Sequence, residues 1–146
     1  MSANSSDALL RLDGLSVRLP VGGELRTVLH DVAFSISAGE ALGLVGESGS
    51  GKSMTARAIA RLLPPGADAS GTITYAGAAV GGLKGAALRT HRAEVAMVFQ
   101  DPRAHINPVR RIGDFMTEAL RTNHDVSRRD AADRATALLA EVGIHD

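Results

Sequence analysis

Alternating apolar and polar residues mark the first part of the 146-residue chain as β-rich. Over Leu9–Leu19 and again over Thr27–Ser37, apolar side chains recur at every second position, which predicts two strands that each bury one face. The stretch Pro20–Glu24 between them is rich in turn-forming residues and predicts an antiparallel hairpin. A further short strand is expected over Thr72–Tyr75.

Two continuous apolar runs, Ala41–Val45 and Glu94–Phe99, are typical of strands that are covered on both faces of a sheet. Apolar positions at helical spacing and terminal signals predict four helices. These are Lys52–Leu63, Ala86–Arg92, Val109–Arg121 and a last helix that begins at the capping box Ser127–Asp130 and stops at Gly143. The order is therefore β-rich, then strand–loop–helix, then helical. A domain boundary near Gln100 would separate residues 1–99 from residues 100–146.

The segment between the first apolar run and the first helix matches the phosphate-binding pattern G-x-x-x-x-G-K-[ST]. Its residues are Gly46, Glu47, Ser48, Gly49, Ser50, Gly51, Lys52 and Ser53. Glycines let successive N–H groups turn toward phosphate oxygens at the start of a helix. Lys52 is expected to contact the β- and γ-phosphates, and the Ser53 hydroxyl to bind Mg²⁺. The alternative, an incidental Gly/Ser-rich turn, is disfavoured by the predicted strand before the loop and the helix after it.

Composition excludes several other functional classes. Sixteen basic and sixteen acidic residues cancel, so no net field attracts nucleic acid or anionic lipid. The absence of cysteine excludes disulfides and thiolate metal sites and is compatible with a reducing cytoplasm. The five histidines lack metal-ligand spacing. Neither a signal peptide nor an apolar stretch of about 20 residues is present, so membrane association is expected only through a partner.

Several motifs together resemble the nucleotide-binding subunits of ABC transporters, most closely those of oligopeptide and dipeptide importers. They are Gly39-Glu40, the loop Gly46–Ser53 with its Glu47, Met97–Pro102, Asn107-Pro108 and Ile112–Asp114. The resemblance runs from about Leu9 to Asp146, and importers of nickel or related solutes share it. It implies an α/β fold: a P-loop NTPase (RecA-like) core with an N-terminal antiparallel β-subdomain and the start of an α-helical subdomain, incomplete in this chain.

The resemblance also implies the ligands and partners. ATP and Mg²⁺ are the expected cofactors, with Gln100 in the Q-loop touching the metal and its attacking water. Met54 stands where the family often has threonine and offers only its backbone N–H to the phosphates. Leu19 stands where an aromatic residue would stack on adenine. The expected partners are transmembrane permease subunits and a second nucleotide-binding subunit, with the protein in the cytoplasm, peripheral on the inner face of the cell membrane.

The family's remaining motifs do not occur by Asp146. They are the LSGGQ-like signature, the Walker B aspartate, the catalytic glutamate, the D-loop and the switch histidine. The resemblance therefore implies that no catalytic residue lies in this chain and that it turns over little or no ATP, although the family is one of ATPases. It also implies a truncated N-terminal portion of low stability, because the two apolar runs would lack parallel neighbours.

Two alternatives stay open. The first is a non-catalytic module that docks Gln100–Arg121 on a transmembrane partner, although Phe115, Met116 and Leu120 have the spacing of core residues. The second is another small P-loop protein. A GTPase would carry an N-K-x-D motif, which is absent, and a kinase would need arginines for its phosphoryl acceptor. For Asp101, loop structure is favoured over a Walker B role. The arginines available to a kinase are Arg103, Arg110 and Arg111.

Overall fold

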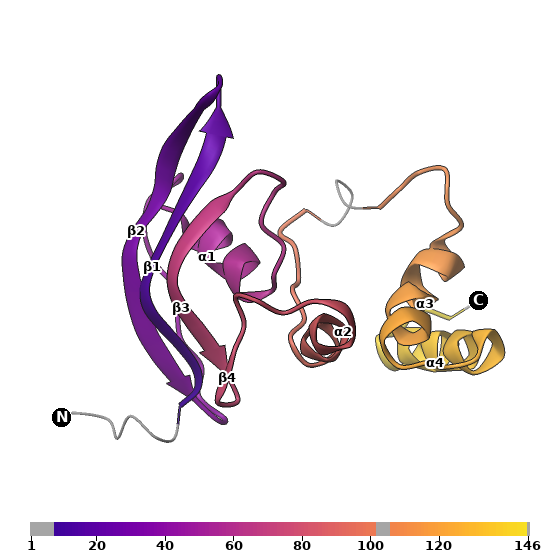
Figure 1. Cartoon of the computed structure of the whole chain (residues 1–146). Coiled ribbons are helices and arrows are strands. Elements are labelled where there is room, and N and C mark those ends of the chain that lie inside the picture. Colours follow the sequence, from indigo (N-terminus) through magenta and orange to yellow (C-terminus); the bar gives the residue numbers. More distant parts are fainter. Residues whose placement is uncertain (1–7, 102–105, 146) are drawn as a thin grey trace. The chain divides into compact units, whose positions relative to one another are not determined.

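The computed structural model describes residues 8–101 and 106–145 (Figure 1). The chain divides into two compact units, residues 1–84 and residues 85–146. The first unit contains the sheet and one helix, and the second contains three helices within its described residues. Gln100, where the sequence predicts a domain boundary, lies inside the second unit. The division of the chain into a nucleotide-binding core and a helical subdomain at this residue stays a prediction.

The sheet of the first unit has four antiparallel strands in the order β2-β1-β3-β4 (Figure 1). The predicted hairpin is confirmed, with both strands slightly longer than the sequence pattern indicates, and the short strand predicted at Thr72 begins earlier. A two-residue strand follows within the glycine-rich stretch 77–85. The strands are β1 (Ala8–Val21), β2 (Glu24–Ser37), β3 (Asp68–Tyr75) and β4 (Ala78–Ala79).

Three neighbouring strands each contain one residue with a positive φ at a point where the strand pairing shifts in register. These residues are Gly14 on β1 (φ 63°), Asp31 on β2 (φ 45°) and Gly71 on β3 (φ 86°). The Asp31 N–H donates to Ser16 Oγ at 3.0 Å, which joins the two irregular strands locally. A Cβ at Gly71 would overlap the backbone carbonyl of Gly14, so glycine is required there. Such bulges bend strands and increase their twist.

The core of the first unit lies between one face of this sheet and the helix α1 (Lys52–Ile59). Leu15, Val17 and Leu29 supply the strand side, and Ala58 supplies the helix side. These side chains are at most 3% exposed, so each contributes its full apolar transfer energy to the unit. The helix ends four residues before the predicted end at Leu63, and Arg61, with a φ of 58°, already has a left-handed backbone.

The two apolar runs predicted as central strands are not strands. Ala41–Val45 and the residues after Glu94 have no ladder partner in the part of the chain that the structure describes. Val45 is 94% exposed and Val98 is 95% exposed. A buried parallel strand forms only when neighbouring strands accept and donate its backbone hydrogen bonds. Both strand predictions were wrong. An apolar run indicates that a segment prefers to be buried, but it does not specify the neighbouring strands with which the segment would pair.

The second unit contains the predicted helices with shifted ends. Glu94, predicted to begin a strand, is the last residue of the first of these helices. The helix predicted from Val109 begins three residues later, where Arg111 in extended conformation precedes its first turn. The elements are α2 (Gly85–Glu94), α3 (Ile112–Asn123) and α4 (Arg128–Glu141).

The ends of α4 confirm the predicted signals. Ser127 Oγ accepts a hydrogen bond from the Asp130 N–H at 3.1 Å, and its hydroxyl donates to Asp130 Oδ2 at 2.7 Å. At the other end, the Gly143 N–H donates to the Ala140 carbonyl at 3.0 Å, and the Ile144 N–H to the Leu139 carbonyl at 2.9 Å. These paired bonds form a Schellman motif, which satisfies carbonyls that the helix leaves open.

Replacing Ser127 with alanine is expected to destabilise α4 by about 1 kcal/mol, because the Asp130 N–H loses its acceptor. Hydrogen exchange of the first-turn amides of α4 in the intact chain measures this effect. Ser127→Asn keeps a capping oxygen and should preserve the protection of wild type. Equal protection in the alanine and asparagine variants would show that the cap does not stabilise this helix.

Candidate functional site

The predicted phosphate-binding loop leads directly into α1, and the start of this helix is fixed on strand β2. Thr55, only 3% exposed, donates both its N–H (2.9 Å) and its hydroxyl (3.1 Å) to the Gly51 carbonyl. Gly51 in turn lies against the side chain of Leu29 and the carbonyl of Val28. Sequence reasoning did not single out Leu29 or Thr55. The signal for Thr55 was its position four residues after Gly51, where a hydroxyl can bond back to a helix carbonyl.

Gly51 occupies a position that only glycine fits. Its φ is 91°, in the left-handed region. A Cβ built on Gly51 would overlap Leu29 Cδ2 and lie 3.2 Å from the Val28 carbonyl oxygen. The glycine therefore allows the N-terminus of α1 to approach the sheet closely, with the free N–H groups of its first turn at the loop.

The Lys52 side chain folds back over the loop that precedes it. Its Nζ donates to the carbonyls of Gly46 and Glu47, both at 2.7 Å, and to Ser50 Oγ at 3.3 Å. The loop itself turns through a hydrogen bond from the Ser50 N–H to the Glu47 carbonyl at 3.2 Å. The ammonium is thus held among the loop residues at the positive end of a helix dipole. That combination of donors suits a phosphate group.

Ser53 and Met54 form the first turn of α1. Ser53 is exposed, so its hydroxyl is accessible to a ligand, whereas Met54 packs against the core of the first unit. Mg²⁺ bound to nucleotides usually keeps several waters and takes phosphate oxygens, so one neutral hydroxyl is a fitting protein ligand. Among residues 8–101 and 106–145 no group of three or more acidic or histidine side chains could hold a metal ion by itself.

Gln100 belongs to the second unit and follows Phe99 on an exposed segment without regular structure. The loop residues Gly46–Ser53 belong to the first unit. The structure therefore describes the two parts of the predicted site separately, and their joint action on Mg²⁺ stays a prediction. Asp101 also lies on this exposed segment, outside any strand.

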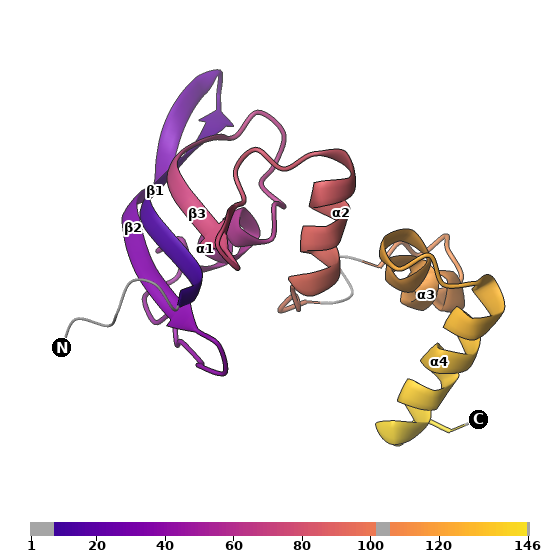
Figure 2. The same cartoon turned by 60° about the horizontal axis from the view of Figure 1, so that its bottom comes forward.

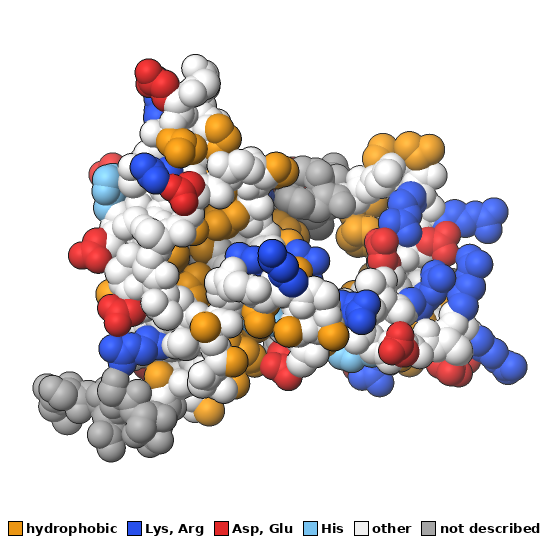
Figure 3. All heavy atoms as spheres, in the orientation of Figure 1, with side chains coloured by type: hydrophobic (Ala, Val, Ile, Leu, Met, Phe, Trp, Pro, Cys, Tyr) orange, Lys and Arg blue, Asp and Glu red, His pale blue; other side chains and the backbone are white. Residues whose placement is uncertain are grey.

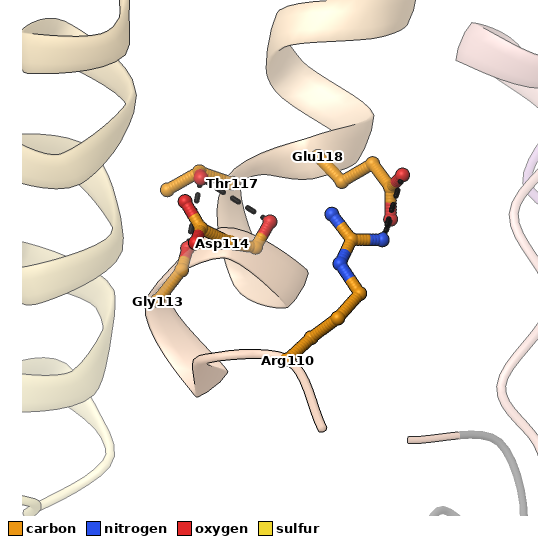
Figure 4. Close-up of polar contacts among 5 residues, drawn as sticks. All are labelled: Arg110, Gly113, Asp114, Thr117 and Glu118. Atoms are coloured by element: carbon orange, nitrogen blue, oxygen red, sulfur yellow. Dashed lines mark hydrogen bonds and ion pairs between the residues drawn. The ribbon is translucent and has the colours of Figure 1, made fainter. Parts of the chain in front are cut away.

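The segment after Gln100 combines exposed apolar residues with ion pairs. Val109 is 90% exposed and Ile112 is 57% exposed, while Phe115 is 38% exposed, so the core position predicted for it was wrong. Arg110 Nη1 contacts both carboxylate oxygens of Glu118 at 2.9–3.0 Å (Figure 4). Arg110 is therefore paired within its own unit, and the alternative role at a phosphoryl acceptor stays a prediction. Arg103 lies outside the described residues.

The first turns of α3 are also joined internally and to α4. Thr117, a buried residue, donates its hydroxyl to the Gly113 carbonyl at 2.8 Å (Figure 4). Arg128 at the start of α4 contacts Asp114 at 3.0 Å. Both partners of this ion pair are partly exposed, so its net stabilisation is about 0–1 kcal/mol. These contacts set α3 against α4 without contributing to a catalytic centre.

No helix within the described ranges has the length and apolar character to cross a membrane.

Comparison with known proteins supports the nucleotide-binding assignment. The family model described as "ABC transporter" matches residues 29–146, which include the whole phosphate-binding loop. A probable peptide ABC transporter ATP-binding protein of Sinorhizobium fredii is 39% identical over 95% of this chain and 40% of its own length. A probable D,D-dipeptide transport ATP-binding protein of Escherichia coli is 46% identical over 81% of this chain and 37% of its own length.

The oligopeptide transport ATP-binding protein OppD of Escherichia coli is 36% identical over 97% of this chain and 42% of its own length. The chain thus spans about two fifths of the length of these relatives. Its antiparallel sheet, its helices and the loop at Lys52 agree with a P-loop NTPase fold of which this chain holds a part. The match covers most of the chain, and the chain belongs to the ABC transporter family.

Proposed function

We propose that this chain is the N-terminal part of the ATP-binding subunit of an ABC importer for peptides or similar solutes. The observation that carries the proposal is the Lys52 ammonium, which donates to two loop carbonyls 2.7 Å away at the N-terminus of α1. The relatives named above, whose names specify peptide, dipeptide or oligopeptide transport, supply the solute class.

Each loop residue would contribute in its own way to phosphate binding. Backbone N–H groups of Gly51–Ser53 would donate to phosphate oxygens, and Lys52 would exchange its carbonyl acceptors for the more strongly accepting phosphates. Ser53 would supply one oxygen to Mg²⁺, with Gln100 as a second neutral oxygen from the Q-loop. Bound Mg²⁺ would neutralise charge on the phosphates.

These 146 residues bind ATP without turning it over in this proposal. The groups that polarise the attacking water in the family, the Walker B aspartate and the glutamate after it, have no counterpart in the sequence. Every group assigned above binds or neutralises phosphate, and none accepts a proton from water. The full-length subunit would supply the remaining groups and hydrolyse ATP.

Partners are proposed on the segment that follows Gln100. Val109, Ile112 and Phe115 expose apolar surface next to the arginines Arg110 and Arg111. This mixture of apolar and cationic side chains suits docking on transmembrane permease subunits at the inner face of the cell membrane. A second nucleotide-binding subunit would complete the pair of ATP sites.

Calorimetric titration of the purified chain with Mg·ATP tests the proposal. We expect saturable binding of ATP, much weaker binding of adenosine, and no phosphate release above the background without protein. Adenosine is the matched control because it lacks the phosphates that the loop is proposed to bind. Equal affinity for ATP and adenosine would reject the loop as the binding site, and turnover by a preparation free of other ATPases would reject the non-hydrolytic role.

A further inference from the structure

A cavity of about 480 Å³ lies in the first unit, beside the C-terminal end of α1. Its walls come from α1, from the segment that links α1 to β3, and from β3 itself, and Figure 2 shows that segment passing from the helix to the strand. The volume is within the range of small-molecule sites, about 300–1,000 Å³. The phosphate-binding loop precedes the other end of α1, so this cavity is a separate place on the molecule.

The floor of the cavity is apolar. Leu15, Ala58 and Ile73 line it and are at most 9% exposed, so their side chains already belong to the core. The rim includes Ala69 and Ser70 of β3, which are exposed, so a ligand can enter from this side. Hydrophobic side chains are visible beside β3 in Figure 3. A ligand with a compact apolar body would therefore gain free energy by covering this floor.

Arg61 gives the cavity its charge. Among the described residues that line it, only Arg61 and Asp68 are charged. The Asp68 carboxylate is compensated by Arg18, whose Nε donates to Asp68 Oδ2 at 3.0 Å. The Arg61 side chain is half-buried, and its Nε is buried. Because a guanidinium has five N–H donors, it can bind a carboxylate in addition to any contact that it makes within the chain.

The backbone holds Arg61 in a conformation that residues with a Cβ rarely adopt, since its φ is 58°. The Arg61 N–H donates to the Ala58 carbonyl at 3.2 Å, and the Leu62 N–H donates to the Arg57 carbonyl at 2.8 Å. This is the Schellman arrangement, in which the left-handed position usually holds glycine. An arginine at this position is less favourable for the backbone than glycine, which favours a use for its side chain.

We propose that this cavity binds a small organic acid, with its carboxylate on the Arg61 guanidinium and its apolar body on the floor formed by Leu15, Ala58 and Ile73. Both parts of the site are needed to define the ligand. An anion without an apolar body leaves the floor uncovered, and a neutral apolar molecule gains no hydrogen bond to a charged group. The site is additional to the proposed ATP site and does not depend on it.

Titration of the intact 146-residue chain with benzoate tests the proposal, with the δ1-methyl NMR signals of isoleucine as the readout. The signal of Ile73, in the cavity, should shift and saturate, whereas that of Ile144, in the second unit, should not shift. Benzyl alcohol has the ring without the charge, and acetate has the charge without the ring. Each is expected to bind about tenfold more weakly than benzoate, because each lacks one of the two contacts.

Two variants test the two parts of the site. Arg61→Gln removes the charge and is expected to weaken benzoate binding about tenfold while leaving benzyl alcohol binding unchanged. Ala69→Leu fills the cavity and should weaken the binding of both. Ala69 is exposed and is paired with Val17, so its side chain lies on the core-facing side of the sheet.

Arg57→Gln is the matched control. Arg57 lies one turn before Arg61, on α1, and is not among the described residues that line the cavity. This variant should bind benzoate as the wild type does. Thermal unfolding of every variant identifies any loss of folded protein. Should Arg61→Gln not fold, the comparison of benzoate, benzyl alcohol and acetate on the wild type decides the same question.

Several results would overturn the proposal. Equal affinity of the wild type for benzoate and benzyl alcohol, or undiminished benzoate binding by folded Arg61→Gln, would exclude the guanidinium as the carboxylate ligand. Equal affinity for benzoate and acetate would exclude the apolar floor. Benzoate binding that persists in Ala69→Leu would place the ligand elsewhere. An unchanged Ile73 signal would show that the cavity binds no such acid, while the titration with Mg·ATP still decides separately on the phosphate-binding loop.

Discussion

Replacing Lys52 with alanine is expected to lower the affinity of the chain for Mg·ATP by about a hundredfold. In the free loop the ammonium donates to the Gly46 and Glu47 carbonyls. With ATP it would donate to charged phosphate oxygens, and hydrogen bonds to charged groups contribute about 1.5–3 kcal/mol each. After the two carbonyl bonds are given up, a net loss of about 2.7 kcal/mol corresponds to the hundredfold change. Calorimetric titration measures it.

The fold should survive the Lys52 substitution. Gly46 and Glu47 are exposed, so water replaces the lost donor and the free energy of unfolding should change by about 1 kcal/mol or less. Lys84→Ala is the matched control, because Lys84 is the only other lysine, is exposed, and lies outside the loop. An alanine variant at Lys52 that binds ATP as tightly as the Lys84 variant would disprove the assignment of the loop.

Replacing Gly51 with alanine is expected to destabilise the first unit by about 2–5 kcal/mol. A left-handed backbone costs a residue with a Cβ roughly 1–2 kcal/mol. The added methyl group would also overlap Cδ2 of Leu29, which belongs to the core cluster. This overpacking adds about 1–3 kcal/mol to the destabilisation. Urea denaturation followed by far-UV circular dichroism measures the shift in the midpoint.

The same substitution should also weaken ATP binding, since relief of the overlap moves the N-terminus of α1 away from β2. Gly82→Ala is the control: this glycine has no neighbour within 4 Å of an added Cβ and no left-handed φ. It should leave the midpoint nearly unchanged. A Gly51 variant as stable as the Gly82 variant would show that α1 does not approach the sheet as closely as described.

Local signals in the sequence were sufficient to predict the β1–β2 hairpin and the two ends of α4. The alternation around Leu15 and Val17 fixes which strand face is buried, and both residues lie in the core. Ser127 and Gly143 mark the ends of α4 through hydrogen bonds to residues within one turn, so the chain near each end carries the required information.

Non-local information was missing where the predictions failed. Val45 and Val98 have the apolar neighbours of a buried strand, yet a strand also needs partners, and no pattern within five residues specifies them. Phe115 was assigned to a core by helical spacing, but spacing identifies a face and not what covers it. The direction of the Lys52 side chain depends on carbonyls five and six residues before it, and the motif alone does not place them.

The three residues of positive φ, Gly14, Asp31 and Gly71, also bear on whether two molecules can pair through the edge of the sheet. β2 is an outer strand of 14 residues, long enough to act as a template for the same strand of another molecule. Asp31 puts a charged residue and a bulge in the middle of that strand, opposite the break at Gly14. A bent, charged edge offers a poorer ladder to a second chain than a flat one. We therefore expect the kinks that shape the sheet also to oppose edge-to-edge aggregation.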